Sequence, residues 1–337
     1  MPAPTPPSGF DPRDLTSFDR GGTLVEEFEE ALRTYGIVIS TKSTLADICL
    51  AALDLENMRL RRTPVDPRTD VRPLFRRAGG LIEFMKLFLR AHAMGRGQPF
   101  VAHLELLNKG HISQNEPVLA HLAPREVYDA SNKLFELFFG LLCVPISTDV
   151  ELDHPVKSKG NNPDVLATID GRRWGFACKV LSGQSAITMF ENIEKGVDQI
   201  EKSAAEIGVV VLKLTNVVDH ELTWPLLNPD EVRVGGEPVL GVRVNERPML
   251  AYLHSIHAMK HTELEQVNGR PAIEALMRGK KTLTGVVSFL QTATGISSSR
   301  GPMPTTVGQL GLMEFDQIAQ VDFDVIERLN EVLHSRL

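Results

Sequence analysis

Hydrophobic residues at helical spacing mark the start of the chain. In "TLVEEFEEALRTYG", Leu24, Phe28 and Leu32 recur at intervals of four residues, which predicts a helix with Gly36 as its C-terminal stop. The next stretch, "STLADICLAALDLENMRLRR", predicts a second helix that begins after a serine or threonine cap.

Two more apolar segments continue the helical pattern. "GGLIEFMKLFLRAHAMG" and "FVAHLELLNKG" predict a third and a fourth helix, after a break at the proline-containing "TPVDPRTDVRP". The first residues, "MPAPTPPSGFDPRD", contain five prolines and no apolar core, so we expect a disordered lead-in rather than a secretory signal. The predicted organisation is therefore a lead-in over residues 1–20 and a helical region over residues 21–118.

The pattern then changes to one that mixes helices and strands. "APREVYDASNKLFELFFGLLCV" predicts a long helix, and "PDVLATID" and "RRWGFACKVL" predict a β-hairpin around a tight Asp170-Gly171 turn. A helix, "SAITMFENIEKGVDQIEKSAAEIG", and a buried strand, "GVVVLKLTN", follow. Later segments predict a helix ("PMLAYLHSIHAMKHTELEQV"), two strands ("TLTGVVSFLQTATG" and "TTVGQLGLMEF") and a closing helix ("DFDVIERLNEVLHSRL"). This order predicts an α/β domain over residues 119–337.

Alternation along the second hairpin strand separates a core face from a candidate ligand face. Because side chains two apart share one side of a strand, residues 175, 177 and 179 lie together, opposite the mostly large, apolar residues of the other face. Lys179 then projects beside the small residues Gly175 and Ala177, which leaves room for a ligand. The hairpin turn brings Asp164 close to Lys179 across the strand pair.

Composition narrows the function classes only a little. With 36 lysines and arginines against 43 aspartates and glutamates, the net charge of -7 disfavours a protein that coats nucleic acid nonspecifically, but a nuclease needs only a positive cleft. No apolar run reaches the roughly 20 residues that span a bilayer, so we expect no membrane association. The three cysteines, Cys49, Cys143 and Cys178, have no paired spacing and indicate reduced thiols in a cytoplasmic protein.

One segment is locally basic. It holds seven arginines against two aspartates, namely Arg59, Arg61, Arg62, Arg68, Arg72, Arg76 and Arg77 against Asp66 and Asp70. A solvated loop with helix ends accounts for this pattern, and a surface that contacts phosphates is the functional alternative.

The hairpin and its neighbours resemble the PD-(D/E)xK, restriction-endonuclease-like nuclease superfamily. The "PD" that ends in Asp164 matches the second core strand of that family, and Lys179 matches the lysine of the third. Upstream, "DASNKLFELFFGLLCVPI" resembles its first core helix, in which Glu136 matches a metal-binding glutamate. Downstream, Gln199 matches a glutamine that many members with a "CK" carry on the next helix. The resemblance covers about residues 125–215.

This resemblance implies a mixed sheet flanked by helices and a metal-dependent nuclease site. Asp164 and Glu136 would bind Mg²⁺ or Mn²⁺, Lys179 would position the nucleophile or stabilise charge, and Gln199 would support the site. The expected substrate is a phosphodiester of nucleic acid, DNA rather than RNA, and a homodimer is the expected form in which such nucleases cut both strands.

Ala177 departs from the family pattern, because an alanine stands where the family carries its second acid. Some members carry that acid on the following helix, where this chain offers Glu191 and Glu194 as metal ligands. If both glutamates face solvent, catalysis loses support. The alternative is then a catalytically inactive member of the fold that binds nucleic acid or protein.

Each candidate side chain also has a structural explanation. Glu136 belongs to a polar helix stripe, Asp164 follows a proline and can cap a turn, and Lys179 can protect an edge strand. A helical interaction protein whose hairpin mimics the motif would keep Asp164 and Lys179 far apart. Elsewhere, "LHSIHAMKHTELEQ" carries three histidines along one helix face, which we interpret as a surface for a partner or nucleic acid rather than a zinc site.

Overall fold

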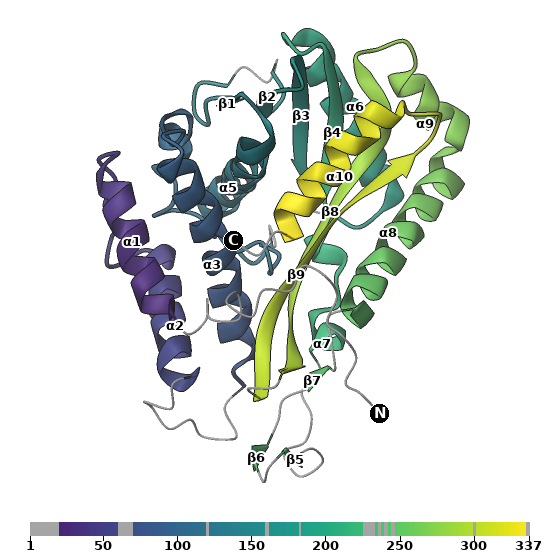
Figure 1. The fold of residues 1–337 in the computed structure, drawn as a ribbon. Coiled ribbons are helices and arrows are strands. Elements are labelled where there is room, and N and C mark those ends of the chain that lie inside the picture. The colour runs from purple at the N-terminus through teal and green to yellow at the C-terminus, as the bar shows by residue number, and fades with distance from the viewer. Residues whose placement is uncertain are drawn as a thin grey trace, which may run out of the picture.

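A mixed β-sheet forms the centre of the molecule in a computed structural model (Figure 1). The structure describes residues 20–59, 70–118, 121–158, 162–181, 183–224, 233–234, 237–238, 242–243, 247–298 and 301–334. In these ranges the strand order is β1-β2-β3-β4-β8-β7, and β9 pairs with β8. The strands are β1 (Asp149–Leu152), β2 (Val165–Ile169), β3 (Arg172–Val180), β4 (Ile207–Lys213), β7 (Val242–Arg243), β8 (Thr282–Ser298) and β9 (Gly301–Glu314), with β5 (Arg233–Val234) and β6 (Glu237–Pro238) forming a separate pair.

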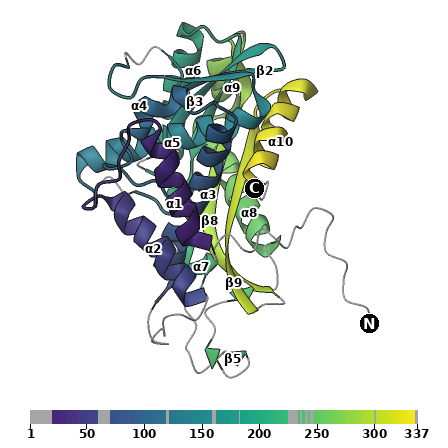
Figure 2. The ribbon, with the colours of Figure 1, turned by 60° about the vertical axis from the view of Figure 1, so that its left-hand side comes forward.

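Helices cover both faces of this sheet (Figures 1 and 2). One face packs against α3 and α5, with α1, α2 and α10 in the same hydrophobic cluster, and the other face packs against α6, α8 and α9. The helices are α1 (Gly21–Arg33), α2 (Thr44–Arg59), α3 (Arg72–Ala93), α4 (Val101–Leu104), α5 (Arg125–Cys143), α6 (Ala186–Lys202), α7 (His220–Thr223), α8 (Arg247–Asn268), α9 (Arg270–Met277) and α10 (Gln320–His334). The predicted α/β class and the helix-flanked mixed sheet are confirmed.

The β2–β3 hairpin forms as its sequence predicts. Asp170 and Gly171 both have positive φ, 51° and 78°, which is the backbone of a two-residue turn between antiparallel strands. The register pairs Val165 with Phe176 and Leu166 with Gly175. Strand β3 then pairs in parallel with β4, all seven residues of which are buried, as expected for a strand covered on both faces.

Several elements differ from the sequence-based prediction. Strand β1 was not predicted, although it pairs along all of its length with β2. The predicted fourth helix is helical only over Val101–Leu104, because the backbone continues in turns such as Leu106 N–H to His103 O and Lys109 N–H to Leu106 O. Helix α9 is a separate helix, since Gly269 interrupts the backbone at φ 81°.

The predicted helical region over residues 21–118 shares its core with the sheet. Phe84 and Phe88 of α3, Phe138 of α5 and Phe289 of β8 are fully buried in one continuous hydrophobic cluster. The predicted lead-in over residues 1–20 lies outside the described residues apart from Arg20. None of the helices in the described ranges is long and apolar enough to cross a membrane.

Candidate active site

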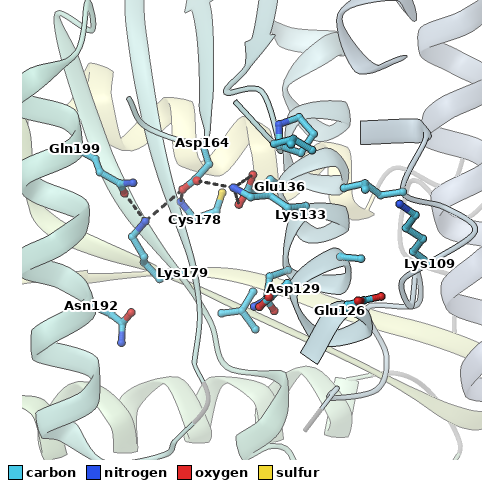
Figure 3. A pocket seen from close by; sticks show the side chains of 16 residues that line it. Lys109, Glu126, Asp129, Lys133, Glu136, Asp164, Cys178, Lys179, Asn192 and Gln199 are labelled. Carbon is cyan, nitrogen blue, oxygen red and sulfur yellow. Dashed lines mark hydrogen bonds and ion pairs between the residues drawn. The ribbon is translucent and has the colours of Figure 1, made fainter. Parts of the chain in front are cut away.

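The end of strand β3 opens into a polar pocket of about 810 Å³ between α5 and α6. Four polar side chains from different elements line this pocket. They are Asp164 just before β2, Lys179 on β3, Glu136 on α5 and Gln199 on α6. Figure 3 shows these side chains pointing toward one another across the pocket. The structure therefore brings together the four residues that the sequence singled out as catalytic.

Asp164 is held by the backbone of the neighbouring strand. Its Oδ2 accepts a hydrogen bond of 2.8 Å from the N–H of Cys178 and lies 3.4 Å from the Lys179 ammonium. The residue is only 5% exposed. Burial, reinforced by the nearby negative charge of Glu136, raises the pKa of the Asp164 carboxyl to about 7, although Lys179 and Lys133 oppose the shift.

Lys179 projects from β3 between two oxygen acceptors. Its ammonium donates to Gln199 Oε1 on α6 and lies within hydrogen-bond distance of Asp164. A mostly buried lysine that contacts both a carboxylate and an amide oxygen is held in one position. Gln199 thus holds the Lys179 ammonium from α6.

Glu136 lies beside Asp164 on the buried side of α5. Burial raises the pKa of its carboxyl, and Lys133 lowers it in part. His103 Nε2 is buried, lies 3.5 Å from Glu136 Oε2 and has no hydrogen-bond partner in the structure. The interpretation of Glu136 as part of a solvent-facing stripe is therefore wrong, since the side chain is only 7% exposed.

Sequence reasoning missed Lys133, which completes the site. Its Nζ donates to both carboxylate oxygens of Glu136, at 2.7 and 3.0 Å, and lies 3.8 Å from Asp164 Oδ1. Burial lowers the pKa of Lys133, but the charges of Glu136 and Asp164 more than offset this effect and raise it overall. A signal was present in the spacing, because residues three apart on a helix are neighbours and Lys133 precedes Glu136 by three.

The two glutamates proposed to replace the missing acid lie elsewhere. Glu191 and Glu194 are exposed on α6, and neither lines the pocket, where α6 presents Asn192 and Gln199. The reason is the phase of the helix, which turns the buried face containing Gly196 toward the sheet. The prediction that Glu191 or Glu194 reaches the site is therefore wrong.

The expected room beside Ala177 is also absent. Ala177 is fully buried, and a Cβ placed on Gly196 would lie only 3.3 Å from its methyl group. Helix α6 thus packs directly over the position, so the small residue serves close helix–strand packing. The expectation that a ligand or another acid enters this space is wrong.

The described arginine side chains of the basic segment pair with acids. Arg72 is buried against Asp70, at 2.7 Å, and Glu221, so it cannot contact a phosphate. Arg76 and Arg77 both lie 3.4 Å from Glu116. Of the other arginines in the basic segment, Arg61, Arg62 and Arg68 lie outside the described residues, as does the side chain of Arg59.

The histidine face of α8 packs in part against the sheet. His257 Nδ1 lies 2.7 Å from Ser288 Oγ on β8, and His254 Nδ1 lies 2.8 Å from Gln309 Nε2 on β9. The ring of His261 meets the edge of Phe315 at a centroid distance of 5.0 Å. His257 and His261 therefore take part in packing, whereas His254 is exposed, and the interpretation of this face as a partner surface stays a prediction.

Two carboxylates and water would be the ligands of a magnesium ion in this pocket. In proteins Mg²⁺ is commonly bound through one or two carboxylates and keeps several waters, and Asp164 and Glu136 supply two adjacent buried carboxylates at an open pocket. Among the described residues no group of three or more His, Cys, Asp or Glu side chains could hold a metal ion. Any metal here would therefore depend on these two carboxylates and water.

The chain matches no protein-family model, no curated protein and no solved structure.

Proposed function

We propose that this protein is a metal-dependent nuclease of the restriction-endonuclease-like fold, acting on DNA phosphodiesters. The observation that carries the proposal is the convergence of Asp164, Lys179, Glu136 and Gln199 in one polar pocket. These four positions were singled out from a motif whose parts lie up to 63 residues apart (199 minus 136). A hairpin that only mimicked the motif would not bring them together. The alternative of a helical interaction protein with such a hairpin therefore loses its support.

Asp164 and Glu136 are the residues that would hold Mg²⁺ or Mn²⁺. A bound divalent ion would lower the pKa of a coordinated water and neutralise charge on the phosphate. Glu136, not a residue of α6, supplies the second carboxylate in this proposal. The site therefore dispenses with an acid at position 177.

Lys179 contributes a fixed positive charge. Because Gln199 and Asp164 hold its ammonium, no reorganisation is needed when negative charge develops on a phosphate oxygen beside it. Asp164 in turn is held by the Cys178 N–H. The chain of contacts aligns one carboxylate and one ammonium toward the same point of the pocket.

The lysines and acids that line the pocket are equal in number, which supports a role for a metal ion in binding a polyanion. Five lysines and five acids line this pocket and the adjoining one on the far side of Lys179, namely Lys109, Lys133, Lys179, Lys195 and Lys202 against Glu126, Asp129, Glu136, Asp164 and Asp198. A lining without excess positive charge attracts a phosphate weakly. A divalent ion would give the pocket the net positive charge that a polyanion requires.

A second candidate function is a catalytically inactive member of the same fold that binds nucleic acid or protein. Two observations favour it, since Ala177 is packed beneath α6 and both Glu191 and Glu194 face solvent. The proposal also includes action in the cytoplasm, which the buried free thiols of Cys49, Cys143 and Cys178 support.

Cleavage assays separate the two functions. Supercoiled plasmid, single-stranded DNA and RNA are incubated with Mg²⁺ or Mn²⁺ and with the parent, Asp164→Asn, Lys179→Met and Glu191→Gln proteins. We expect the parent to cleave DNA, the first two variants to lose at least about 100-fold in rate, and the exposed Glu191→Gln control to match the parent. A folded parent that cleaves none of the substrates would reject the nuclease proposal and favour the inactive alternative.

A further inference from the structure

The position between the two carboxylates already holds a positive charge from the chain itself. Figure 3 shows Lys133 reaching from α5 to this position, with contacts to both Glu136 and Asp164. Its ammonium lies 2.7 and 3.0 Å from the two oxygens of Glu136 and 3.8 Å from Asp164 Oδ1. One cation therefore contacts three carboxylate oxygens.

A divalent ion would need the same oxygens. Mg²⁺ binds carboxylate oxygen at about 2.0–2.1 Å, which is closer than an ammonium approaches, and the two cations would repel each other across a few ångströms of buried space. Lys133 and a metal ion would therefore compete for the oxygens of Glu136 and for Asp164 Oδ1, which Lys133 occupies. An ion that takes these oxygens requires Lys133 to withdraw from them.

Lys133 has a route by which it can leave. Its side chain is 25% exposed, whereas the Glu136 side chain is 7% exposed, so the lysine lies nearer the open side of the pocket. Asp129, four residues earlier on α5, lines the same pocket, is 62% exposed and pairs with the exposed Arg125 at 3.5 Å. Residues four apart share a helix face, so Asp129 offers the released ammonium a second carboxylate.

We propose that Lys133 is an internal cation that holds the site without metal, and that a divalent ion binds by displacing Lys133 toward Asp129. This inference rests on the proposed function, since it concerns the metal position of that same site. Lys133 is a positioning residue, because it acts through Glu136 and Asp164.

Calorimetric titration with Mn²⁺, with no substrate present, tests this competition. The proteins are the parent, Lys133→Met, and Lys109→Met as a matched control that removes the same charge from an exposed position on the same pocket. We expect Lys133→Met to bind Mn²⁺ at least about tenfold more tightly than the parent, and Lys109→Met to differ from the parent by less than about threefold. The rise in melting temperature on addition of Mn²⁺ should be largest for Lys133→Met.

A second variant keeps the test decisive if Lys133→Met does not fold. Asp129→Asn retains Lys133 but removes its alternative partner, and we expect it to weaken Mn²⁺ binding about threefold or more. Parent-like affinity in each variant that folds would overturn the inference while leaving a metal-dependent nuclease intact. Failure of every protein to bind Mn²⁺, with no cleavage by the parent, would overturn the proposed function and the inference together.

Discussion

At the scale of single residues, Ala177 controls how closely helix α6 approaches the sheet. Its methyl group lies beneath Gly196, and a Cβ on that glycine would come within 2.8 Å of Val210 Cγ2. A position that a nuclease motif reserves for an acid is here part of the hydrophobic core. The carboxylate that lies beside Asp164 in the pocket is instead that of Glu136, on helix α5, which packs on the opposite side of the sheet.

Replacing Ala177 by glutamate should therefore destabilise the fold rather than restore an acid to the site. We expect Ala177→Glu to lower the free energy of unfolding by about 3–5 kcal/mol, because a carboxylate and added volume enter a packed core. Urea unfolding measures this change, and Ala177→Gln separates the cost of volume from that of charge. A variant as stable as the parent, whose melting temperature rises with Mg²⁺, would contradict this prediction.

Lys213 is a second residue whose surroundings set its chemistry. It is buried at the end of β4, where its ammonium donates a hydrogen bond of 2.6 Å to Gln114 Oε1 and lies 5.4 Å from the centre of the Phe135 ring. Burial lowers the pKa of its amine to about 7. Lys213 therefore differs from Lys133 and Lys179, which both contact acids.

The buried amine of Lys213 makes stability depend on pH. Because its folded-state pKa of about 7 lies below that of an unfolded lysine, the cost of burying the charge is fully present below pH 7 and disappears as pH rises toward 10.5. We expect Lys213→Met to stabilise the protein by roughly 2–4 kcal/mol at pH 6.5, and by less at pH 9.5.

Chemical denaturation of the parent and Lys213→Met at both pH values measures this difference. Lys202→Met is the control, since Lys202 is exposed on α6, and it should change stability equally at the two pH values. Equal stability changes for Lys213→Met at the two pH values would show that the amine does not titrate in this window.

At the scale of elements, helix α10 protects the outer edge of strand β9. Asn330 Oδ1 accepts a hydrogen bond of 2.8 Å from the Leu310 N–H, and His334 Nε2 lies 2.7 Å from the Gly308 carbonyl oxygen. These side chains pair with backbone groups that an edge strand would otherwise leave open. Side chains of the C-terminal helix thus bond to backbone groups at this edge of the sheet, beside which α10 runs (Figure 1).

Loss of this edge contact should weaken the C-terminal part of the fold. We expect Asn330→Ala to lower the free energy of unfolding by about 1–2 kcal/mol, because the buried Leu310 N–H loses its acceptor. Asn330→Asp keeps an oxygen acceptor and serves as the matched variant. Urea unfolding that placed Asn330→Ala within about 0.3 kcal/mol of the parent would argue that water replaces the amide.

At the scale of the whole molecule, the N-terminal helices and the sheet form one core. Phe28 of α1, Phe88 of α3, Phe138 of α5 and Phe176 of β3 belong to the same continuous cluster. Helix α3 lies between the outer helices α1 and α2 and the sheet layer (Figure 2). The helical region therefore completes the hydrophobic face on which α5 and Glu136 are positioned.

A chain that begins at residue 119 should not fold on its own. Removal of α1 to α3 would expose part of this cluster to water, and apolar area contributes about 25 cal/mol per Å² when it is buried. We expect a chain of residues 119–337 to lack a cooperative thermal transition by circular dichroism, whereas a chain that lacks only residues 1–19 keeps the parent transition. Cooperative unfolding of the shorter chain would indicate an independent α/β domain.

Local patterns predicted the parts of the molecule that depend on neighbouring residues. The Asp170-Gly171 turn, the buried strand β4 and helices α5, α6 and α8 follow from turn chemistry and periodicity within short windows. The pairing of Asp164 with Lys179 followed from the same hairpin, because a tight turn fixes the register of its strands. Strand β1 was missed, since four residues carry too little pattern to be recognised.

The sequence by itself thus determined the α/β class, most of the order of elements and the pairing of Asp164 with Lys179, and the family resemblance added Glu136 and Gln199. Only the tertiary structure decided which helix supplies the second carboxylate, because the phase of α6 turns Glu191 and Glu194 outward while α5 buries Glu136. It also placed Lys133 between the two acids and packed Ala177 under Gly196. Such contacts join segments distant in sequence, and they depend on helix rotation and close packing that no short window of residues encodes.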